Sequence, residues 1–335
     1  MPDVEIRVEG RAGRITLNRP QALNALTLPM VQAVRAALVE WAQDAAVALV
    51  VVDGTGGRAL CAGGDIRVLY DAARAGEMDT PRAFFTEEYA MNGEIARFPK
   101  PYVALMDGMV IGGGVGISAH GSVRVVTERT ALAMPETGIG LFPDVGATWL
   151  LSRDLSRGLH LALTGARIGA GDTIAAGLAD HFIRYGKLRM LIEELRNCVG
   201  WEAVSSCIGW HREAPPPATI VGDWISACYT RPTMEAIVEA LAANKDHRAQ
   251  AAAVEIAGKS PSSCKVTLRA LREAAGMGSL DEALGRELVL AMGCMKSHDF
   301  VEGVRAAVID KDRAPVWLPA RLEDVSEGDV AAYFS

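Results

Sequence analysis

The sequence contains little that would tie the chain to a metal, a disulfide framework or a membrane. Its six cysteines form neither a CxxC pair nor another metal-ligand spacing, and its six histidines are scattered. We therefore expect reduced, mostly buried thiols and no metal site. No apolar stretch is long enough to cross a bilayer, and the acidic first residues do not resemble a signal peptide. These absences favour a cytoplasmic protein without a membrane partner.

Positive charge is also in short supply. Lys and Arg total 34 against 41 Asp and Glu, a net charge of −7, and no basic tract is interleaved with aromatic residues. This composition argues against a nucleic-acid partner. An anionic ligand would instead need helix N-termini and local cations. Arg19 and Arg67 are candidates for these cations. Because half of the residues are hydrophobic and 22% are charged, an ordinary globular core is expected.

Short β-branched runs alternate with amphipathic segments in the first half of the chain. The predicted strands cover residues 14–17, 47–52, 102–106, 123–126 and 132–134, and a helix capped by Thr27 covers residues 27–41. After about residue 185 the pattern is mainly helical, and from Thr233 it is broken only at 258–261 and 276–278. The triple proline at 215–217 is either a tether or a stiff surface loop. The sequence predicts an α/β core followed by a mainly helical C-terminal region.

Two glycine turns each follow a predicted strand and open a helix, at residues 60–67 and 109–116. Taken singly, each is explained by a tight strand-to-helix connection. Together they have a chemical use, because two backbone amides from separate turns can converge on one oxygen and form an oxyanion hole. Neither turn has the GxGxxG spacing of a dinucleotide site or the Gly-Lys-Ser/Thr ending of a phosphate loop, so nucleotide binding is disfavoured.

Residues 134–146 place Glu136 and Asp144 on one short segment bounded by prolines and glycines. A surface turn would explain Glu136 alone, and helix capping would explain Asp144 alone. Beside two glycine turns, the pair favours proton transfer next to a developing oxyanion, and hence thioester chemistry. Ser118 lacks the Gly-x-Ser-x-Gly elbow of a serine hydrolase, and Cys61 has no nearby histidine, so both are expected to be packing residues.

Residues 60–66, 112–116 and 135–136 resemble the enoyl-CoA hydratase/isomerase, or crotonase, superfamily. A larger set of residues resembles its 3-hydroxyisobutyryl-CoA hydrolase subfamily: 119–121, 127–129, 134–146, 259–262, 265–268, 299–306 and 309–312. This resemblance implies a crotonase-like spiral of repeated ββα units with a mainly helical C-terminal region. It also implies a catalytic core over residues 1–195 and a helical region over 196–335 that completes the active site.

The resemblance implies roles for eight residues. Catalytic roles fall to Glu136 and Asp144, oxyanion-hole amides to Gly64 and Gly113, and substrate binding to Glu88, Ala62, Asp65 and Ile66. Hydratases of the superfamily generally have glycine where this chain has Asp144, and they place their first catalytic glutamate where it has Gly116. The implied reaction is therefore hydrolysis of a short 3-hydroxyacyl-CoA.

The implied substrate is 3-hydroxyisobutyryl-CoA, an intermediate of valine catabolism. The resemblance implies no cofactor, because CoA is part of the substrate, and an assembly into trimers or hexamers. Two alternatives stay open: an enoyl-CoA hydratase or isomerase of the same superfamily, and a non-catalytic acyl-CoA-binding protein. Thiol release from 3-hydroxyisobutyryl-CoA, compared with hydration of crotonyl-CoA, separates the hydrolase from the hydratase or isomerase. CoA binding without turnover would indicate the non-catalytic binding protein.

Overall fold

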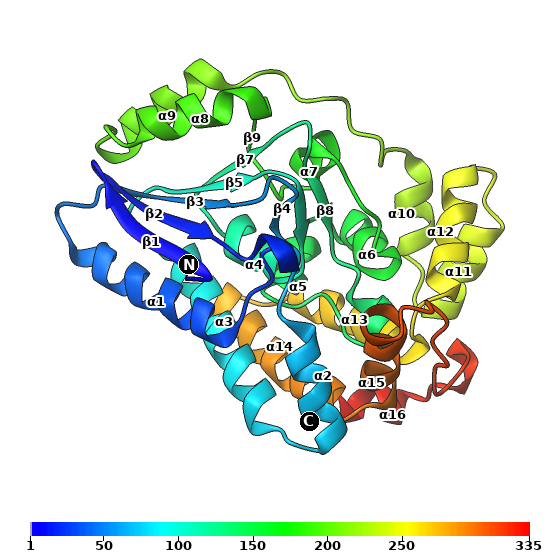
Figure 1. Ribbon diagram of the computed structural model, residues 1–335. Coiled ribbons are helices and arrows are strands. Elements are labelled where there is room, and N and C mark those ends of the chain that lie inside the picture. Colours follow the sequence, from blue (N-terminus) through cyan, green and yellow to red (C-terminus); the bar gives the residue numbers. More distant parts are fainter. Residues whose placement is uncertain (1) are drawn as a thin grey trace. The chain divides into compact units, whose positions relative to one another are not determined.

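A computed structural model describes residues 2–335 (Figure 1). The chain divides into two compact units that interleave along the sequence. The first, here called the sheet unit, takes in the chain up to Gly64, Glu87–Leu132 and Arg167–Thr219. The second, here called the helical unit, takes in Asp65–Thr86, Ala133–Ala166 and Ile220–Ser335. The sequence predicts one boundary at 195/196, whereas the units exchange segments several times.

The sheet unit is organised by two sheets. The larger has the strand order β1 (Val4–Glu9), β2 (Ala12–Leu17), β3 (Leu49–Gly54), β5 (Tyr102–Met106), β7 (Val123–Val126) and β9 (His181–Phe182), and the smaller has the order β4 (Ala59–Cys61), β6 (Met109–Ile111) and β8 (Ala131–Ala133). Only β1 and β2 pair as an antiparallel hairpin in the larger sheet, and its other pairs are parallel. The five predicted strands are confirmed, although β3 begins two residues later than predicted.

Burial explains the composition of the central strands. Every residue of β5 is buried, as are the four apolar residues that begin β3, because parallel strands are covered on both faces. The helices of this unit are α1 (Leu28–Gln43), α4 (Gly113–Ala119), α7 (Ala170–Ala175), α8 (Leu188–Leu195) and α9 (Gly200–His211), with short 3₁₀ turns at Pro20–Ala22 and Tyr185–Lys187. Thr27 caps α1 as predicted, accepting a hydrogen bond from the Met30 N–H.

Helices α8 and α9 lie side by side (Figure 1). They pack on the strands through one hydrophobic cluster that includes Leu191, Leu195 and Ile208 from the helices and Val51 and Val103 from the sheet. The burial of these aliphatic side chains, about 1.5–3 kcal/mol each, holds the α8–α9 hairpin against the sheet.

The triple proline follows α9 as exposed chain. It is fixed to α7, because Thr219 bonds the Asp172 carboxylate through both its N–H and its hydroxyl, at 2.7 Å each. Gly171 of α7 lies so close to this strap that a β-carbon would come within 2.2 Å of the Pro216 carbonyl oxygen. The segment is therefore an exposed strap bound to the sheet unit.

The helical unit consists of short helices and turns. They are α2 (Ile66–Ala75), η2 (Glu136–Ile139), α5 (Ala147–Leu151), η3 (Ser152–Asp154), α6 (Leu155–Thr164), α10 (Asp223–Tyr229), α11 (Met234–Ala242), α12 (His247–Ala257), α13 (Pro261–Ala274), α14 (Leu280–Met295), α15 (His298–Val304), a π-helical turn η5 (Arg305–Ile309), η6 (Leu322–Asp324) and α16 (Glu327–Ala332). Helix α3 (Asp79–Ala96) begins in this unit and ends in the sheet unit. The mainly helical C-terminal region and its two predicted breaks are confirmed, and a further break that the sequence does not predict separates α11 from α12 at residues 243–246.

Helix α13 lies at the centre of the helical unit, where it contacts α5, α6, α11 and α16. Ser260 caps it by accepting from the Ser263 N–H, and Pro261 occupies its first turn, where a missing N–H does no harm. Among residues 2–335, no helix combines the length and the apolar character that a membrane span requires.

Candidate active site

The first glycine turn follows β4 and is fixed by hydrogen bonds to the segment that precedes α1. The Ala62 N–H donates to the Leu23 carbonyl at 3.0 Å, and the Leu26 N–H donates to the Gly63 carbonyl at 2.8 Å. Gly63 has a φ of +108°, which only glycine adopts without strain. The Gly63 carbonyl and the Gly64 N–H belong to one planar peptide group, so the bond from Leu26 fixes the direction of that donor.

The second glycine turn opens α4. Gly112 has a φ of 50° and precedes Gly113, the first helical residue. The N–H of Gly113 has no acceptor within α4, because the first N–H groups of a helix lie beyond the reach of its own carbonyls. Further along α4, the N–H groups of Val115 and Gly116 both donate to the Gly112 carbonyl.

The two glycine turns lie against each other, and Glu88 lies beside them. A β-carbon placed on Gly113 would come within 2.5 Å of Glu88 Oε1 and 3.4 Å of the Gly63 carbonyl carbon. One on Gly114 would come within 2.3 Å of the Cys61 carbonyl oxygen. Glu88 belongs to α3 and is only 2% exposed. The sheet unit therefore brings three of the predicted residues together, Gly64, Gly113 and Glu88.

Cys61 and Ser118 are packing residues, as expected. Burial, together with the nearby Glu88 carboxyl, raises the pKa of the Cys61 thiol to about 12, so the thiol keeps its proton. It donates to the Gly63 carbonyl at 3.4 Å and so supports the first turn. Ser118 is fully buried in α4, where its hydroxyl donates to the Gly114 carbonyl at 2.6 Å.

The predicted substrate-binding residues around the first turn continue into the helical unit. Ala62 is half-buried in the sheet unit. Asp65 occupies the N-cap position of α2 and Ile66 is its first residue, both half-buried. Arg67, a candidate for the CoA phosphates, is exposed on the first turn of α2, whereas Arg19 is engaged by the Ala25 carbonyl at 2.8 Å.

Glu136 begins a 3₁₀ turn in the helical unit and is only 6% exposed. Backbone contacts hold the turn from several sides. The Ser260 N–H donates to the Thr137 carbonyl at 3.0 Å, and a β-carbon on Gly140 would lie 2.2 Å from the Asp299 backbone. This close approach requires glycine at 140, where φ is +72°. The turn therefore fixes the backbone from which the Glu136 carboxyl projects.

Asp144, 5% exposed, lies in the loop between that turn and α5. The helix-capping alternative for Asp144 is wrong, because α5 begins only at Ala147 with Gly146 as its N-cap. Val145 and Gly146 have φ values of 57° and 80° and separate the carboxylate from the helix. A β-branched residue rarely adopts a positive φ, so Val145 is strained.

Glu287 of α14 holds this strained loop and is absent from the residues that the sequence singles out. Its carboxyl accepts from the Gly146 N–H at 2.6 Å, the Thr148 N–H at 3.1 Å and the Thr148 hydroxyl at 2.5 Å. It therefore caps α5 from 141 residues away. Burial raises the pKa of Glu287 to about 8, against the lowering effect of these donors, and the Asp144 charge raises it further. Asp144 is thus electrostatically coupled to a second, fully buried acid.

A signal for Glu287 exists in the sequence. The buried positions of α14 recur at helical spacing, through Ala283, Leu284, Leu290 and Ala291, and Glu287 falls on that same face. A carboxyl on the apolar face of a helix is rare unless it has a partner. The pattern identifies a buried acid, but it does not identify the partner loop.

A cavity of about 600 Å³ in the sheet unit lies elsewhere and includes none of the predicted site residues. Its three arginines are matched by three acids: Arg14 pairs with Asp53 at 2.6 Å, Arg129 pairs with Asp107, and Arg189 and Glu193 also line the cavity. Arg129 also stacks on the Tyr185 ring. Because these charges neutralise one another, the cavity has no evident preference for an anionic ligand.

The titration of Glu287 gives a testable stability effect. An acid whose folded pKa lies near 8 rather than 4.5 favours folding while it is protonated, and this contribution is lost as the pH rises from about 4.5 to about 8. Glu287→Gln does not titrate. The free energy of unfolding of the wild type, relative to that variant, is expected to fall by about 2–3 kcal/mol between about pH 5.5 and 7.5.

Denaturant unfolding at both pH values measures this effect. The amide of the Glu287→Gln variant cannot match every hydrogen bond of the carboxyl, but this loss of stability is about equal at each pH. It therefore cancels when the two pH values are compared. Glu239→Gln, a change on the exposed face of α11, is the control and is expected to show no such pH dependence. A wild-type-to-variant difference that is constant with pH would contradict the raised pKa.

Comparison with known proteins places the chain in a family. Residues 12–334 match the enoyl-CoA hydratase/isomerase family. The chain is 43% identical over 342 residues to the mitochondrial 3-hydroxyisobutyryl-CoA hydrolases of Rattus norvegicus and Homo sapiens, covering 99% of this chain and 88% of each relative.

Two solved structures are also similar over the whole chain. A carnitinyl-CoA dehydratase from Mycobacterium thermoresistibile has a TM-score of 0.95 at 44% identity, and an enoyl-CoA hydratase from Rhodobacter sphaeroides 2.4.1 has a TM-score of 0.89 at 41% identity. Each comparison covers 100% of this chain and 97% of the other. The predicted crotonase-like fold is confirmed, and the chain belongs to the enoyl-CoA hydratase/isomerase family.

Proposed function

We propose that the protein hydrolyses a short 3-hydroxyacyl-CoA thioester, with 3-hydroxyisobutyryl-CoA as the foremost substrate and 3-hydroxyisobutyrate and CoA as products. The observation that carries the proposal is the segment 134–146, which holds two buried carboxylic acids, Glu136 and Asp144, on a backbone constrained by other elements. The names of the relatives at 43% identity support the same reaction. A place in valine catabolism is part of the proposal.

In the proposed reaction, the N–H groups of Gly64 and Gly113 donate to the thioester carbonyl oxygen. Attack on the carbonyl carbon moves negative charge onto that oxygen, and donors already fixed in direction stabilise the charge without reorganising. The contact between the two glycine turns supports this role, because it fixes both donors within one unit.

Glu136 either takes a proton from the attacking water or attacks the carbonyl itself to form a mixed anhydride that water then opens. Both routes end with the same balance: water adds across the acyl–sulfur bond, the acid forms, and CoA leaves as the thiol. Asp144 orients the 3-hydroxyl or the water and shares in proton transfer. The neighbouring Glu287 supports this role, because it holds the loop of Asp144 through three hydrogen bonds.

Hydration or dehydration of a CoA ester is the second candidate, favoured by the names of the two similar structures. It would use the same oxyanion donors but needs a second positioned acid. The family resemblance assigns that acid to the position of Gly116, which is fully enclosed in α4 and has no side chain. This departure favours hydrolysis.

Thiol release decides between the candidates. We expect the purified chain to release free CoA from 3-hydroxyisobutyryl-CoA, followed with a thiol reagent, and to hydrate crotonyl-CoA at least about 100-fold more slowly, since one proton-transfer group is worth about that factor. Rapid hydration without thiol release would support the second candidate. CoA binding without turnover of either substrate would support a non-catalytic role.

Three parts of the prediction accompany this proposal. Apart from water, the acyl-CoA substrate is the only small molecule that the reaction needs, with no cofactor beyond the CoA that it carries. The assembly expected from the family resemblance is a trimer or hexamer, which sedimentation velocity measures. A cytoplasmic location is expected from the sequence, and fractionation of the source cells tests it.

A further inference from the structure

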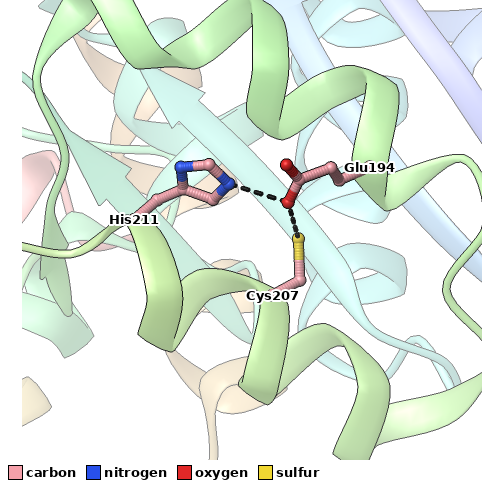
Figure 2. Close-up of side chains that lie close together, drawn as sticks. All are labelled: Glu194, Cys207 and His211. Atoms are coloured by element: carbon pink, nitrogen blue, oxygen red, sulfur yellow. Dashed lines mark hydrogen bonds and ion pairs between the residues drawn. The ribbon is translucent and has the colours of Figure 1, made fainter.

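Three side chains with metal-binding donor atoms meet on the α8–α9 hairpin of the sheet unit. Figure 2 shows Glu194 of α8 between Cys207 and His211 of α9. One carboxylate oxygen, Glu194 Oε2, lies 2.8 Å from His211 Nε2 and 3.7 Å from Cys207 Sγ. All three donor atoms lie within 4.8 Å of one another.

A fourth donor, Cys198, lies beside this group. Its thiol is within hydrogen-bonding reach of the Cys207 thiol. Cys207 and His211 are four positions apart within α9, so their side chains share one face of that helix and can chelate one ion together. Cys198 lies beyond the end of α8, in the turn before α9, where its thiol also donates to the Glu194 and Ala203 carbonyls at 3.7 Å each. Donors from α8, this turn and α9 can therefore approach one ion.

The dimensions match a small tetrahedral cation. Zinc bonds of about 2.0–2.3 Å imply distances of about 3.3–3.7 Å between neighbouring ligand atoms. The Cys207–Glu194 separation is already 3.7 Å. The 2.8 Å His211–Glu194 separation is shorter because a hydrogen bond joins these atoms, and a cation between them needs an opening of only about 0.5 Å. Rotation of the half-exposed Glu194 side chain supplies this opening.

A simple ion pair between His211 and Glu194 explains only part of the arrangement. It does not account for the buried Cys207 thiol, which lies 3.7 Å from the same carboxylate oxygen, or for the Cys198 thiol beside it. A divalent cation replaces the thiol protons and offsets the negative charge that the site then collects.

We propose that Glu194, Cys198, Cys207 and His211 bind one zinc-class divalent cation that fixes the α8–α9 hairpin. Mixed sulfur, nitrogen and oxygen donors select zinc over magnesium or calcium. Cys207 belongs to the hydrophobic cluster that joins this hairpin to the sheet, and Cys198 packs against it. The ion therefore stabilises the sheet unit and takes no part in thioester chemistry.

The expectation of no metal site follows from searching for close cysteine pairs. Here the two cysteines are nine positions apart, one ligand is a glutamate, and the ligands come together only when α8 folds onto α9. Spacing within each helix is visible in the sequence, but the pairing of the helices is not.

Cobalt titration of the full-length reduced chain tests the proposal. Co²⁺ alone is expected to give intense tetrahedral ligand-field bands and a thiolate-to-cobalt charge-transfer band, saturating at one equivalent. Zn²⁺ is expected to displace it and to raise the unfolding temperature. Cys207→Ser and His211→Gln are each expected to weaken cobalt binding at least about 100-fold, since even residues that only orient ligands change affinity by up to that factor.

Matched controls separate this site from casual binding. Glu193→Gln, beside Glu194 on α8, and His247→Gln, on α12 of the helical unit, change exposed residues of the same types and are expected to leave the titration unchanged. A wild-type titration without a thiolate-to-cobalt band overturns the proposal, and this result does not depend on whether the variants fold. Cobalt binding by Cys207→Ser that is as tight as wild-type binding also overturns the proposal. So does a Cys198–Cys207 disulfide in the isolated protein if its reduction yields thiols that bind no metal.

Discussion

A chain carrying Glu136→Gln is expected to release CoA from its best thioester at least about 100-fold more slowly than the wild type, while still binding that thioester. The amide has nearly the shape of the carboxylate but neither accepts a proton from water nor attacks a carbonyl, and a positioned acid or base contributes about 10²–10⁴-fold. Steady-state thiol release gives kcat, and calorimetric titration with a non-hydrolysable analogue gives binding. The loss is expected in kcat with KM little changed.

The fold is expected to tolerate this substitution. The 3₁₀ turn uses the Glu136 carbonyl, which accepts from the Leu141 N–H at 3.0 Å and from the Gly140 N–H, and these bonds do not involve the side chain. Glu239→Gln, the exposed change on α11, serves again as the control and should retain full activity. Near-wild-type thiol release by Glu136→Gln would remove this residue from the proposed mechanism.

Local patterns were sufficient for the elements that carry their own signal. The apolar run at Tyr102–Met106 is a strand because burial on both faces requires it, and Thr27 with Pro29 defines the start of α1. The glycine turns were also visible, since Gly63 and Gly112 occupy backbone conformations that other residues avoid. These features depend on a few consecutive residues, and so they are readable from the sequence.

Long-range contacts explain what the sequence did not predict. The helical unit draws on segments on both sides of Arg167–Thr219, so no single boundary describes it. Asp144 was taken as adjacent to a helix, but the positive φ values of Val145 and Gly146 place α5 further along the chain. That backbone is held by Glu287, which lies 141 residues from Gly146. The positive φ of Val145 and its stabilisation by Glu287 therefore could not be predicted from the segment 134–146 alone.

Gly113→Ala is expected to reduce thiol release about 100-fold or more, even though the change adds a single methyl group. The new β-carbon would lie 2.5 Å from Glu88 Oε1 and 3.3 Å from Leu26 Cδ1, so the buried Glu88 carboxyl or the start of α4 must shift. A shift of α4 moves the N–H of residue 113, and the loss of one oxyanion donor reduces kcat by about 10²–10³-fold. Thiol-release kinetics measure the loss, and circular dichroism verifies that the variant is folded.

The matched control is Gly169→Ala, at the N-cap of α7 in the same unit. A β-carbon there meets no atom within 4 Å, and the backbone has an ordinary φ of −88°, so full activity is expected. A second comparison distinguishes a displaced donor from a general loss of stability. If Gly113→Ala unfolds at a lower temperature but retains wild-type kcat well below that temperature, the glycine serves only packing and the amide of residue 113 is not an oxyanion donor. If kcat falls while the variant remains folded, the close contact between the two turns serves to keep the N–H of residue 113 in the direction that catalysis requires.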